Sequence, residues 1–395
     1  MQNSMDSPDH DGSKAALPAV LLLALCTAIT QGMARFSYGP LVPAMLGREI
    51  GSASTAGALA MAHMTGYLFG SVFVLRLGSR WAPIQSVRAG IFLTTLGLGV
   101  LAVSPTTSAL AVGLIATGFG AAMTWILAPN IAASLWPARR GVAIGLVAGS
   151  MGIGLIAASG LASAVPEQHW RSVWAIECAV AAVVWVSAMK VLTAPHVDRS
   201  THEKIRLPWR IDAAWSRSTA AFAIFSFGVA MCLTFLVAGL ERSMGGGQLY
   251  ARLAYASIGI GMLAGGVLFE RLSQRWGRTI TLSLQYLLFA LSLSAVLRVP
   301  ERGVVIVVII VIGATMTGTA ATLIADLTDR HSTSVATALF GSVFLPVGLG
   351  QILGPIFGGW AIDTFDFKTA FTACGALSVA GAAPLLYRAL TTRPR

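Results

Sequence analysis

Long apolar runs, separated by short polar breaks, make up most of this chain. A helix needs about 20 mainly apolar residues to cross the hydrocarbon core of a membrane. Twelve runs reach that length, and the pattern therefore predicts an all-α membrane protein with twelve transmembrane helices. We expect these helices at residues 16–39, 54–77, 86–104, 107–135, 141–164 and 170–190, and at 217–240, 249–272, 279–298, 303–327, 333–360 and 367–390.

The composition supports a membrane location. Of the 395 residues, 55% are hydrophobic and only 11% are charged, whereas soluble domains have about 25% charged residues. A soluble protein of this size could not cover its surface with so few charges, so the surplus apolar area must face lipid. The four cysteines all lie inside apolar runs and form no CxxC pair. We interpret them as small buried hydrophobic residues.

The basic residues indicate the orientation of the chain. Net charge is +11, but the 27 Lys and Arg residues are spread over the breaks between runs and do not form a nucleic-acid-binding patch. Nineteen lie in breaks on the side of the two termini and seven on the opposite side, while Arg35 lies within a run. Cytoplasmic loops are richer in Lys and Arg, so we expect both termini in the cytoplasm of a bacterial cell, inside the inner membrane.

The polar segments divide the chain into four parts. Residues 1–15 are polar and lack the basic start of a secretion signal, so we expect a disordered cytoplasmic tail that is retained. The longest polar interruption, Lys190 to Arg217, separates six predicted helices from six. We therefore expect an N-terminal bundle at 16–190, a cytoplasmic linker at 191–216 and a C-terminal bundle at 217–395.

An internal repeat relates the two halves. Residues 66–81 (GYLFGSVFVLRLGSRW) align without a gap to residues 261–276 (GMLAGGVLFERLSQRW), and eight of the sixteen positions are identical. The shared R…L…RW pattern is not explained by membrane composition. A second, weaker repeat pairs HWRSVW at 169–174 with DFKTAF at 366–371, where an aromatic, a basic, a hydroxyl and an aromatic residue recur in the same order. Two parallel six-helix halves are typical of one large class of secondary transporters, which bind substrate at mid-membrane between the halves.

Several motifs resemble the major facilitator superfamily. The stretch GFGAA (118–122) resembles the end of the fourth-helix motif of that family, although Leu114 stands where an arginine is usual. The turn after the second helix resembles the family's basic turn, but Leu75 replaces the acid that the second half keeps as Glu270. The segments at 32–45 and 348–363 are similar to the YbfB/YjiJ-type branch.

This resemblance implies two pseudo-symmetric six-helix bundles that work by alternating access. It also implies a cytoplasmic gate network around the two basic turns, to which we assign Arg76, Arg80, Glu270, Arg271 and Arg275.

Arg35 is the leading candidate for substrate binding. Charged residues within a membrane span are rare and usually mark functional sites, and a guanidinium suits a carboxylate or phosphate. Gln31, Arg35 and Tyr38 are spaced to share one helical face, so we expect all three to contact substrate. The alternatives are a structural arginine paired with another helix, or one that extends to the membrane interface.

Two further residues are candidates for proton coupling. His63 lies inside the second predicted helix, with Tyr67 one turn further on, and histidine can change charge near physiological pH. Glu177 is the carboxylate placed deepest within a predicted span. A neutral, packed histidine is an alternative for His63. Glu177 could instead pair with Arg35 or make a polar contact between helices.

Other polar residues are candidates for the cavity wall. Each also has a structural interpretation, because threonine can bond to its own helix and tryptophan often anchors a membrane interface. These candidates are Trp125, Asn130, Thr315, Thr319 and Gln351.

We therefore predict a secondary transporter of a small, anionic organic solute, coupled to a proton gradient. No nucleotide-binding motif is present in the sequence, and scattered histidines without an acidic cluster argue against an intramembrane enzyme. We expect no cofactor, no bound metal, no nucleic-acid partner and a monomer in the bilayer. The alternatives are a drug or metabolite exporter with a mostly apolar cavity, and a transporter-derived sensor without flux.

Overall fold

The structure, a computed structural model, is entirely helical over the residues it describes, which are 9–77, 81–192, 213–245, 247–330 and 333–391. Its first membrane-spanning unit is a broken helix made of α1 (Asp9–Thr27), the π-helical turn η1 (Ala28–Met33), α2 (Ala34–Phe36) and α3 (Tyr38–Met45). The rest of the first half contains α4 (Ala53–Leu77), α5 (Pro83–Val103), α6 (Thr107–Leu135), α7 (Arg140–Ala164) and α8 (Arg171–Val191). The second half contains α9 (Ala213–Met244), α10 (Gly247–Trp276), α11 (Arg278–Ala295), α12 (Arg302–Arg330), α13 (Thr333–Thr364) and α14 (Phe367–Thr391).

These helices confirm the predicted fold class of twelve long helical units. Nine segments in the described chain are long and apolar enough to cross a membrane, and α11, α13 and α14 complete the set. Most boundaries lie within four residues of the prediction. The largest difference at a C-terminus is in the first unit, which continues to Met45 although Pro40 and Pro43 follow the predicted end. At the N-terminus, α1 begins at Asp9, inside the segment expected to be a tail.

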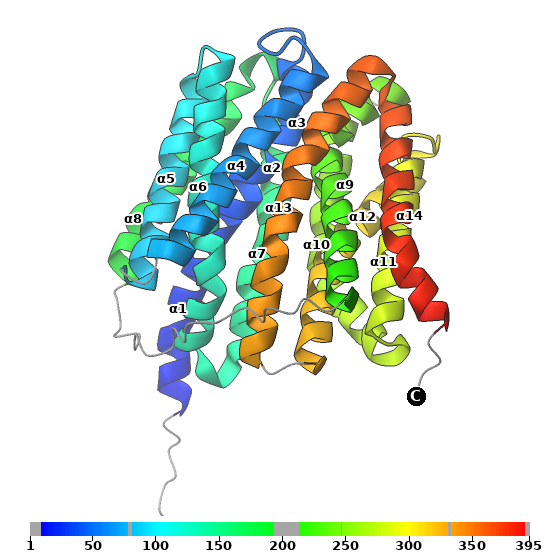
Figure 1. Cartoon of the computed structure of the whole chain (residues 1–395). Coiled ribbons are helices and arrows are strands. Elements are labelled where there is room, and N and C mark those ends of the chain that lie inside the picture. Colours follow the sequence, from blue (N-terminus) through cyan, green and yellow to red (C-terminus); the bar gives the residue numbers. More distant parts are fainter. Residues whose placement is uncertain (1–8, 78–80, 193–212, 246, 331–332, 392–395) are drawn as a thin grey trace, which may run out of the picture.

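The two groups of six helices stand side by side, with the start of α1 and the end of α14 at the same end of the bundle (Figure 1). We call this the terminal end and the opposite one, with the loop between α3 and α4, the far end. The repeated segments found in the sequence close α4 and α10, which occupy equivalent places in the two halves. The halves contact each other through α4 with α13, α7 with α10, and α3 with α9.

Glycines let the two halves approach closely toward the far end. A β-carbon on Gly57 of α4 would overlap the carbonyl oxygen of Pro355 in α13, and one on Gly359 would overlap that of Ala53. In the other pair of helices, at mid-height, a β-carbon on Gly152 of α7 would lie 2.9 Å from the carbonyl oxygen of Gly259 in α10. Small residues allow such approach where lipid supplies no hydrophobic drive for association.

The same helix pairs separate toward the terminal end. A β-carbon on Gly145 or Gly141 of α7 would have no neighbour within 4 Å. In α13, a β-carbon on Gly348 would find its nearest neighbour, Leu68 of α4, at 4.0 Å. The halves are therefore closed against each other at the far end and diverge toward the terminal end.

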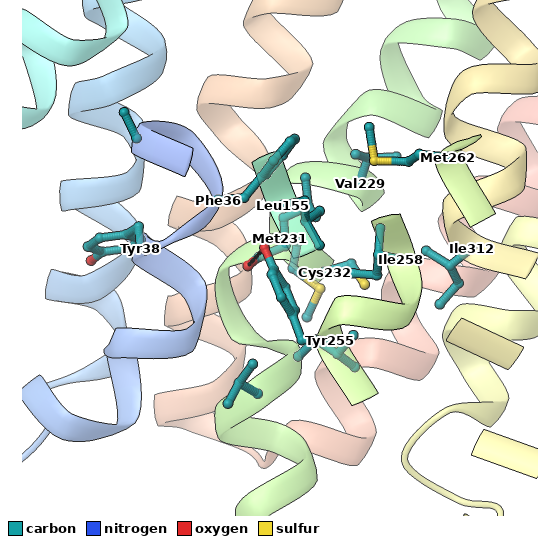
Figure 2. Close-up of a cluster of buried hydrophobic side chains, with 14 of the residues drawn as sticks. Phe36, Tyr38, Leu155, Val229, Met231, Cys232, Tyr255, Ile258, Met262 and Ile312 are labelled. Atoms are coloured by element: carbon teal, nitrogen blue, oxygen red, sulfur yellow. Dashed lines mark hydrogen bonds between the residues drawn. The ribbon is translucent and has the colours of Figure 1, made fainter. Parts of the chain in front are cut away.

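An apolar cluster ties the halves together in the membrane interior. Figure 2 shows Phe36 of α2 close to Leu155 of α7 and, on the side of the second half, Tyr255 of α10. Phe36 is 2% exposed and Tyr255 is fully buried. The Tyr255 hydroxyl donates a hydrogen bond to the carbonyl oxygen of Leu233 in α9 (3.2 Å), so the polar tip of this ring is satisfied inside the cluster.

At the far end, one half also caps a helix of the other. The carboxylate of Asp363 in α13 accepts hydrogen bonds from the backbone N–H of Ala53 (2.9 Å) and from the N–H (2.8 Å) and hydroxyl (2.6 Å) of Ser54. These groups form the N-terminus of α4, whose first N–H groups have no partner within the helix and whose dipole attracts a negative charge. The cap joins two helices that belong to different halves.

A complementary cap joins α7 and α10. The guanidinium of Arg252 in α10 donates to the carbonyl oxygens of Ala162 and Val165 at the C-terminus of α7, with the Val165 distance at 3.4 Å. The hydroxyl of Ser159 donates in return to the Arg252 carbonyl oxygen (2.7 Å). A cation stabilises a helix C-terminus as an anion stabilises a helix N-terminus. Each of the two pseudo-symmetric contacts therefore pairs a charged side chain with the end of a helix from the other half.

We expect Asp363→Ala to loosen the far end. Loss of an N-cap costs about 1 kcal/mol, and here it removes contacts between halves. In an Ala60→Cys background, labelling by a water-soluble maleimide applied at the far end should rise several-fold. Asp366→Ala is the matched control, because Asp366 caps α14 within its own half through the N–H of Thr369 (2.7 Å). Equal labelling of the two variants would contradict a latch between halves.

Candidate functional site

A small cavity lies between the two halves. The first half contributes its wall from α2, α3, α4 and α6, and the second half from α9 and α13. The side chains that line it are Arg35, Phe36, Tyr38, Gly39, Ala60, His63, Met64, Leu114, Ala230, Leu233, Thr234 and Pro355. This arrangement matches the inter-half pocket expected from the internal repeat.

The cavity lies near the middle of the membrane. Arg35, His63 and Thr234 are each ten residues from the far end of their helical units, at Met45, Ala53 and Met244 respectively. At 1.5 Å per residue this is a depth of about 15 Å, which is half the thickness of a hydrocarbon core of about 30 Å. The charged group of Arg35 is therefore placed where a charge is most costly unless something compensates it.

Arg35 bridges the two halves. Its Nη2 donates a hydrogen bond to Oε1 of Gln351 in α13 (3.2 Å), and its guanidinium lies 5.3 Å from the centre of the Phe36 ring. The ion pairs of the described chain do not include Arg35, so its charge has no acidic partner there.

A break in the first helical unit presents Arg35 to the cavity. The Ala34 N–H bonds to the carbonyl oxygen of Ile29, five residues back, and so closes the π-helical turn. The chain then bends at Ser37 before α3. Single π-helical turns are frequent at functional sites, and this one shifts the side chains that follow it relative to a regular helix. The bend and the π-helical turn are features that hydrophobic periodicity does not predict.

The altered register separates the three residues predicted to share a face. Arg35 and Tyr38 line the cavity. Gln31 is turned into the first half, where its amide donates to the carbonyl oxygen of Ala121 in α6 (3.2 Å). The Tyr38 hydroxyl donates to the carbonyl oxygen of Ala56 in α4 (2.7 Å), so Tyr38 offers the cavity its ring.

His63 lies in the cavity wall beside Arg35. Its Nδ1 is 3.1 Å from the hydroxyl oxygen of Thr117 in α6, and that hydroxyl donates its own proton to the carbonyl oxygen of Leu114 (2.9 Å). Thr117 therefore accepts from His63, which assigns the proton of the neutral ring to Nδ1. The lone pair on Nε2 has no partner among the described residues.

The other predicted wall residues lie at different places. Gln351 meets Arg35 as described above. Thr315 and Thr319 are fully buried in α12 and do not line this cavity; Thr315 donates to the carbonyl oxygen of Ile312 (2.8 Å). Trp125 is half-buried and Asn130 is exposed, both on α6 toward the terminal end.

The chain matches the Major Facilitator Superfamily over residues 24–345 and again over 220–395. It belongs to the major facilitator superfamily. This is a family of membrane transporters rather than enzymes, and the chain has the multi-pass fold of the family.

Similar proteins agree with this assignment. The uncharacterized transporter YgaY of Escherichia coli, from strains K12 and O157:H7, is 23% identical over 232 residues, which are 58% of this chain and 57% of YgaY. Two structures of the nucleoside transporter NupG align with TM-scores of 0.74 and 0.72 at 14% identity, covering 93% and 95% of this chain and 99% of each NupG chain. A bacterial homologue of the human lysosomal transporter Spinster, in an inward-facing and unoccupied conformation, aligns at 0.72 and 14% identity, over 95% of this chain and 96% of its own.

The predicted gate residues that the structure describes lie at the terminal end of the protein. Glu270 of α10 accepts two hydrogen bonds from Arg278 of α11 (2.8 and 2.9 Å), and Arg278 also pairs with Asp329 of α12 (2.9 Å). This network lies within the second half, and the prediction missed Arg278 and Asp329. The side chains of Arg76, Arg271 and Arg275 are exposed, and Arg80 lies outside the described residues.

Glu177 is part of a buried relay in the first half of the transporter. Its Oε2 accepts a hydrogen bond from the Ser37 hydroxyl (3.1 Å), and Ser37 in turn accepts one from the indole N–H of Trp174 (3.1 Å). Glu177 is fully buried, and its Oε1 has no partner within the described chain. The relay fastens α8 to the bend that follows Arg35, so Glu177 is a neighbour of that bend and not a partner of Arg35.

Several residues around Arg35 had no signal in the sequence. Phe36, Leu233 and Thr234 look like ordinary members of apolar helices, and Tyr255 lies 220 residues away in the chain. Tyr67 was noticed for its spacing from His63, and the structure places it within electrostatic reach of Arg35. Arg35 and His63 stood out because a charged or titratable group inside an apolar run is unusual, and Tyr38 and Gln351 were also among the sequence candidates.

We expect Glu177→Gln to preserve the relay and Glu177→Leu to break it. Glutamine keeps a carbonyl oxygen for the Ser37 hydroxyl, whereas leucine leaves this buried donor unsatisfied, which costs about 1–3 kcal/mol. Thermal unfolding in detergent should therefore be close to wild type for Glu177→Gln and clearly lower for Glu177→Leu. Equal melting temperatures for the two variants would show that the relay contributes nothing to stability.

Proposed function

We propose that this transporter carries a small organic anion across the bacterial inner membrane by alternating access, coupled to protons. The observation that supports this most directly is the Arg35 guanidinium, which lies in a cavity at mid-membrane without an acidic partner among the described residues. A buried charge is strongly unfavourable unless it is paired. The bound substrate would supply the missing negative charge.

The geometry around His63 supports proton coupling. His63 and Arg35 line the same buried cavity, so a second positive charge on His63 Nε2 would be disfavoured while the cavity is empty. An anion bound between the two groups would offset that repulsion and let Nε2 take up a proton. The anion and the proton would then bind together, and the loaded cavity would carry the same net charge as the empty one.

The closed far end and the divergent terminal end fit one state of an alternating-access cycle. With the termini in the cytoplasm, as the excess of Lys and Arg on that side favours, this state opens toward the cytoplasm. The moving units would be the bundles at 16–190 and 217–395, joined by the linker at 191–216, in a monomer. The segments at 32–45 and 348–363 further support a place in the YbfB/YjiJ-type branch.

One observation favours the second candidate, an exporter of hydrophobic drugs or metabolites. Eight of the twelve lining residues have uncharged side chains without a hydrogen-bonding group, and these surfaces would also accept an apolar, uncharged compound. The two candidates differ in whether transport requires Arg35. A variant that removes the Arg35 charge therefore distinguishes them.

We expect Arg35→Gln to abolish anion transport. Truncating one partner of a buried charge pair costs about 2–5 kcal/mol, so apparent affinity should fall by at least about 30-fold. The measurement is uptake of radiolabelled 3-phenylpropanoate and related acids into proteoliposomes with an imposed pH gradient. Arg48→Gln is the matched control, since the Arg48 side chain is exposed in the far-end loop.

Uptake that is unchanged in Arg35→Gln would contradict the anion site. Transport of uncharged hydrophobic compounds by both wild type and Arg35→Gln would favour the exporter instead. A protein that binds acids but moves none of them would indicate a sensor derived from a transporter.

We expect His63→Gln to uncouple proton binding from anion binding. Glutamine can still donate to Thr117, but it cannot accept the coupling proton. Adding sodium 3-phenylpropanoate to purified protein in weak buffer near pH 7 should make the wild type take up about one proton per bound anion. The variant should take up none, while His169→Gln, at an exposed histidine of the far end, should behave as wild type. Equal proton uptake in all three proteins would exclude His63 as the coupling site.

A further inference from the structure

We propose that the substrate is a monocarboxylate with an uncharged, apolar body, and not an amino acid, an elongated dicarboxylate, a sugar or a nucleoside. This inference rests on the proposed anion site at Arg35 and narrows the chemistry that the same cavity accepts.

The polar groups of the cavity wall are few and mostly in use. Four lining residues have polar side chains: Arg35, Tyr38, His63 and Thr234. The Tyr38 hydroxyl proton is donated to the Ala56 carbonyl oxygen (2.7 Å), and that of Thr234 to the Ala230 carbonyl oxygen (2.8 Å). The guanidinium of Arg35 and the Nε2 of His63 remain for a ligand.

Both groups belong to residues that line the same cavity, and the Arg35 side chain is fixed from the opposite half by Gln351 (3.2 Å). A single carboxylate can accept hydrogen bonds from the guanidinium fork and from a protonated His63 at once. The polar anchor of the cavity therefore accommodates one carboxylate.

The remaining walls are built from carbon and one thioether. They are formed by Phe36, Gly39, Ala60, Met64, Leu114, Ala230, Leu233 and Pro355. A polar group of the ligand that faced these walls would lose its hydration without gaining a partner, which costs several kcal/mol. The substrate body that fits them is apolar.

A cavity with one polar anchor and apolar walls excludes several common classes of solute. The α-ammonium of an amino acid would lie close to the Arg35 guanidinium, and no carboxylate lines the described cavity to compensate it. A second carboxylate at the other end of the molecule would face the apolar walls. Sugars and nucleosides need several hydrogen-bonding partners, so the resemblance to NupG extends to the fold and not to its ligand.

A panel of compounds with one shared skeleton tests the proposal. The parent acids are 3-phenylpropanoate and 4-methylpentanoate. Phenylalanine and leucine add only an α-ammonium to them, 3-(4-carboxyphenyl)propanoate adds a distant carboxylate, 3-phenylpropanamide removes the charge, and uridine represents nucleosides. Binding is measured on the purified full-length transporter from the rise in melting temperature with ligand concentration, up to about 10 mM.

We expect the parent acids to stabilise the wild type and every other compound to bind at least about tenfold more weakly, the equivalent of about 1.4 kcal/mol. Arg35→Gln and Arg35→Met should both lose the response to the parent acids, whereas Arg48→Gln should keep it. Two variants at position 35 are used so that poor folding of one does not decide the result.

Two results would overturn the proposal, and they are distinguishable. If an amino acid, the dicarboxylate or uridine binds as tightly as the parent acids and its binding requires Arg35, the substrate class is wrong while the site at Arg35 stands. If no acid binds, or if the acids bind equally well to the Arg35 variants, both this inference and the proposed function fail.

Discussion

The Arg35 charge in the membrane interior is the constraint on which the rest of the site depends. A guanidinium at mid-membrane needs a hydrogen-bonding partner, a shield from lipid and, in the loaded state, a counter-charge. Gln351 of the opposite half supplies the hydrogen-bonding partner. The closure of the two halves shields the guanidinium from lipid. The ion pairs of the described residues give it no counter-charge, and this is the basis on which we propose an anionic substrate.

The contacts that close the far end belong to the same helices that line the cavity. The helix α4 carries His63 in its middle and offers its N-terminus to Asp363, while α13 carries both Gln351 and Asp363. A motion that separates α4 from α13 at the far end therefore also displaces groups of the cavity wall. Access and binding are linked in this way by rigid helices, without a separate connecting element.

Parts of this organisation were predictable because they depend on local patterns. The length of the apolar runs located the helices, and the repeat at 66–81 and 261–276 identified α4 and α10 as equivalent helices. Arg35 and His63 were recognisable because each interrupts an apolar run. Gln31 shows the limit of such reasoning, because its spacing could not predict the π-helical turn or the hydrogen bond to the carbonyl oxygen of Ala121.

The sequence alone determined the membrane class, the twelve helices, the two related halves and the presence of a charge at membrane depth. These properties follow from hydrophobicity, periodicity and repetition, which act over one helix or one repeat. Only the tertiary structure decided that Arg35 meets Gln351, that Asp363 caps α4, and that Arg278 pairs with Glu270. Those pairings depend on how helices approach and rotate against one another, and that is set by packing between residues up to 316 positions apart in the chain.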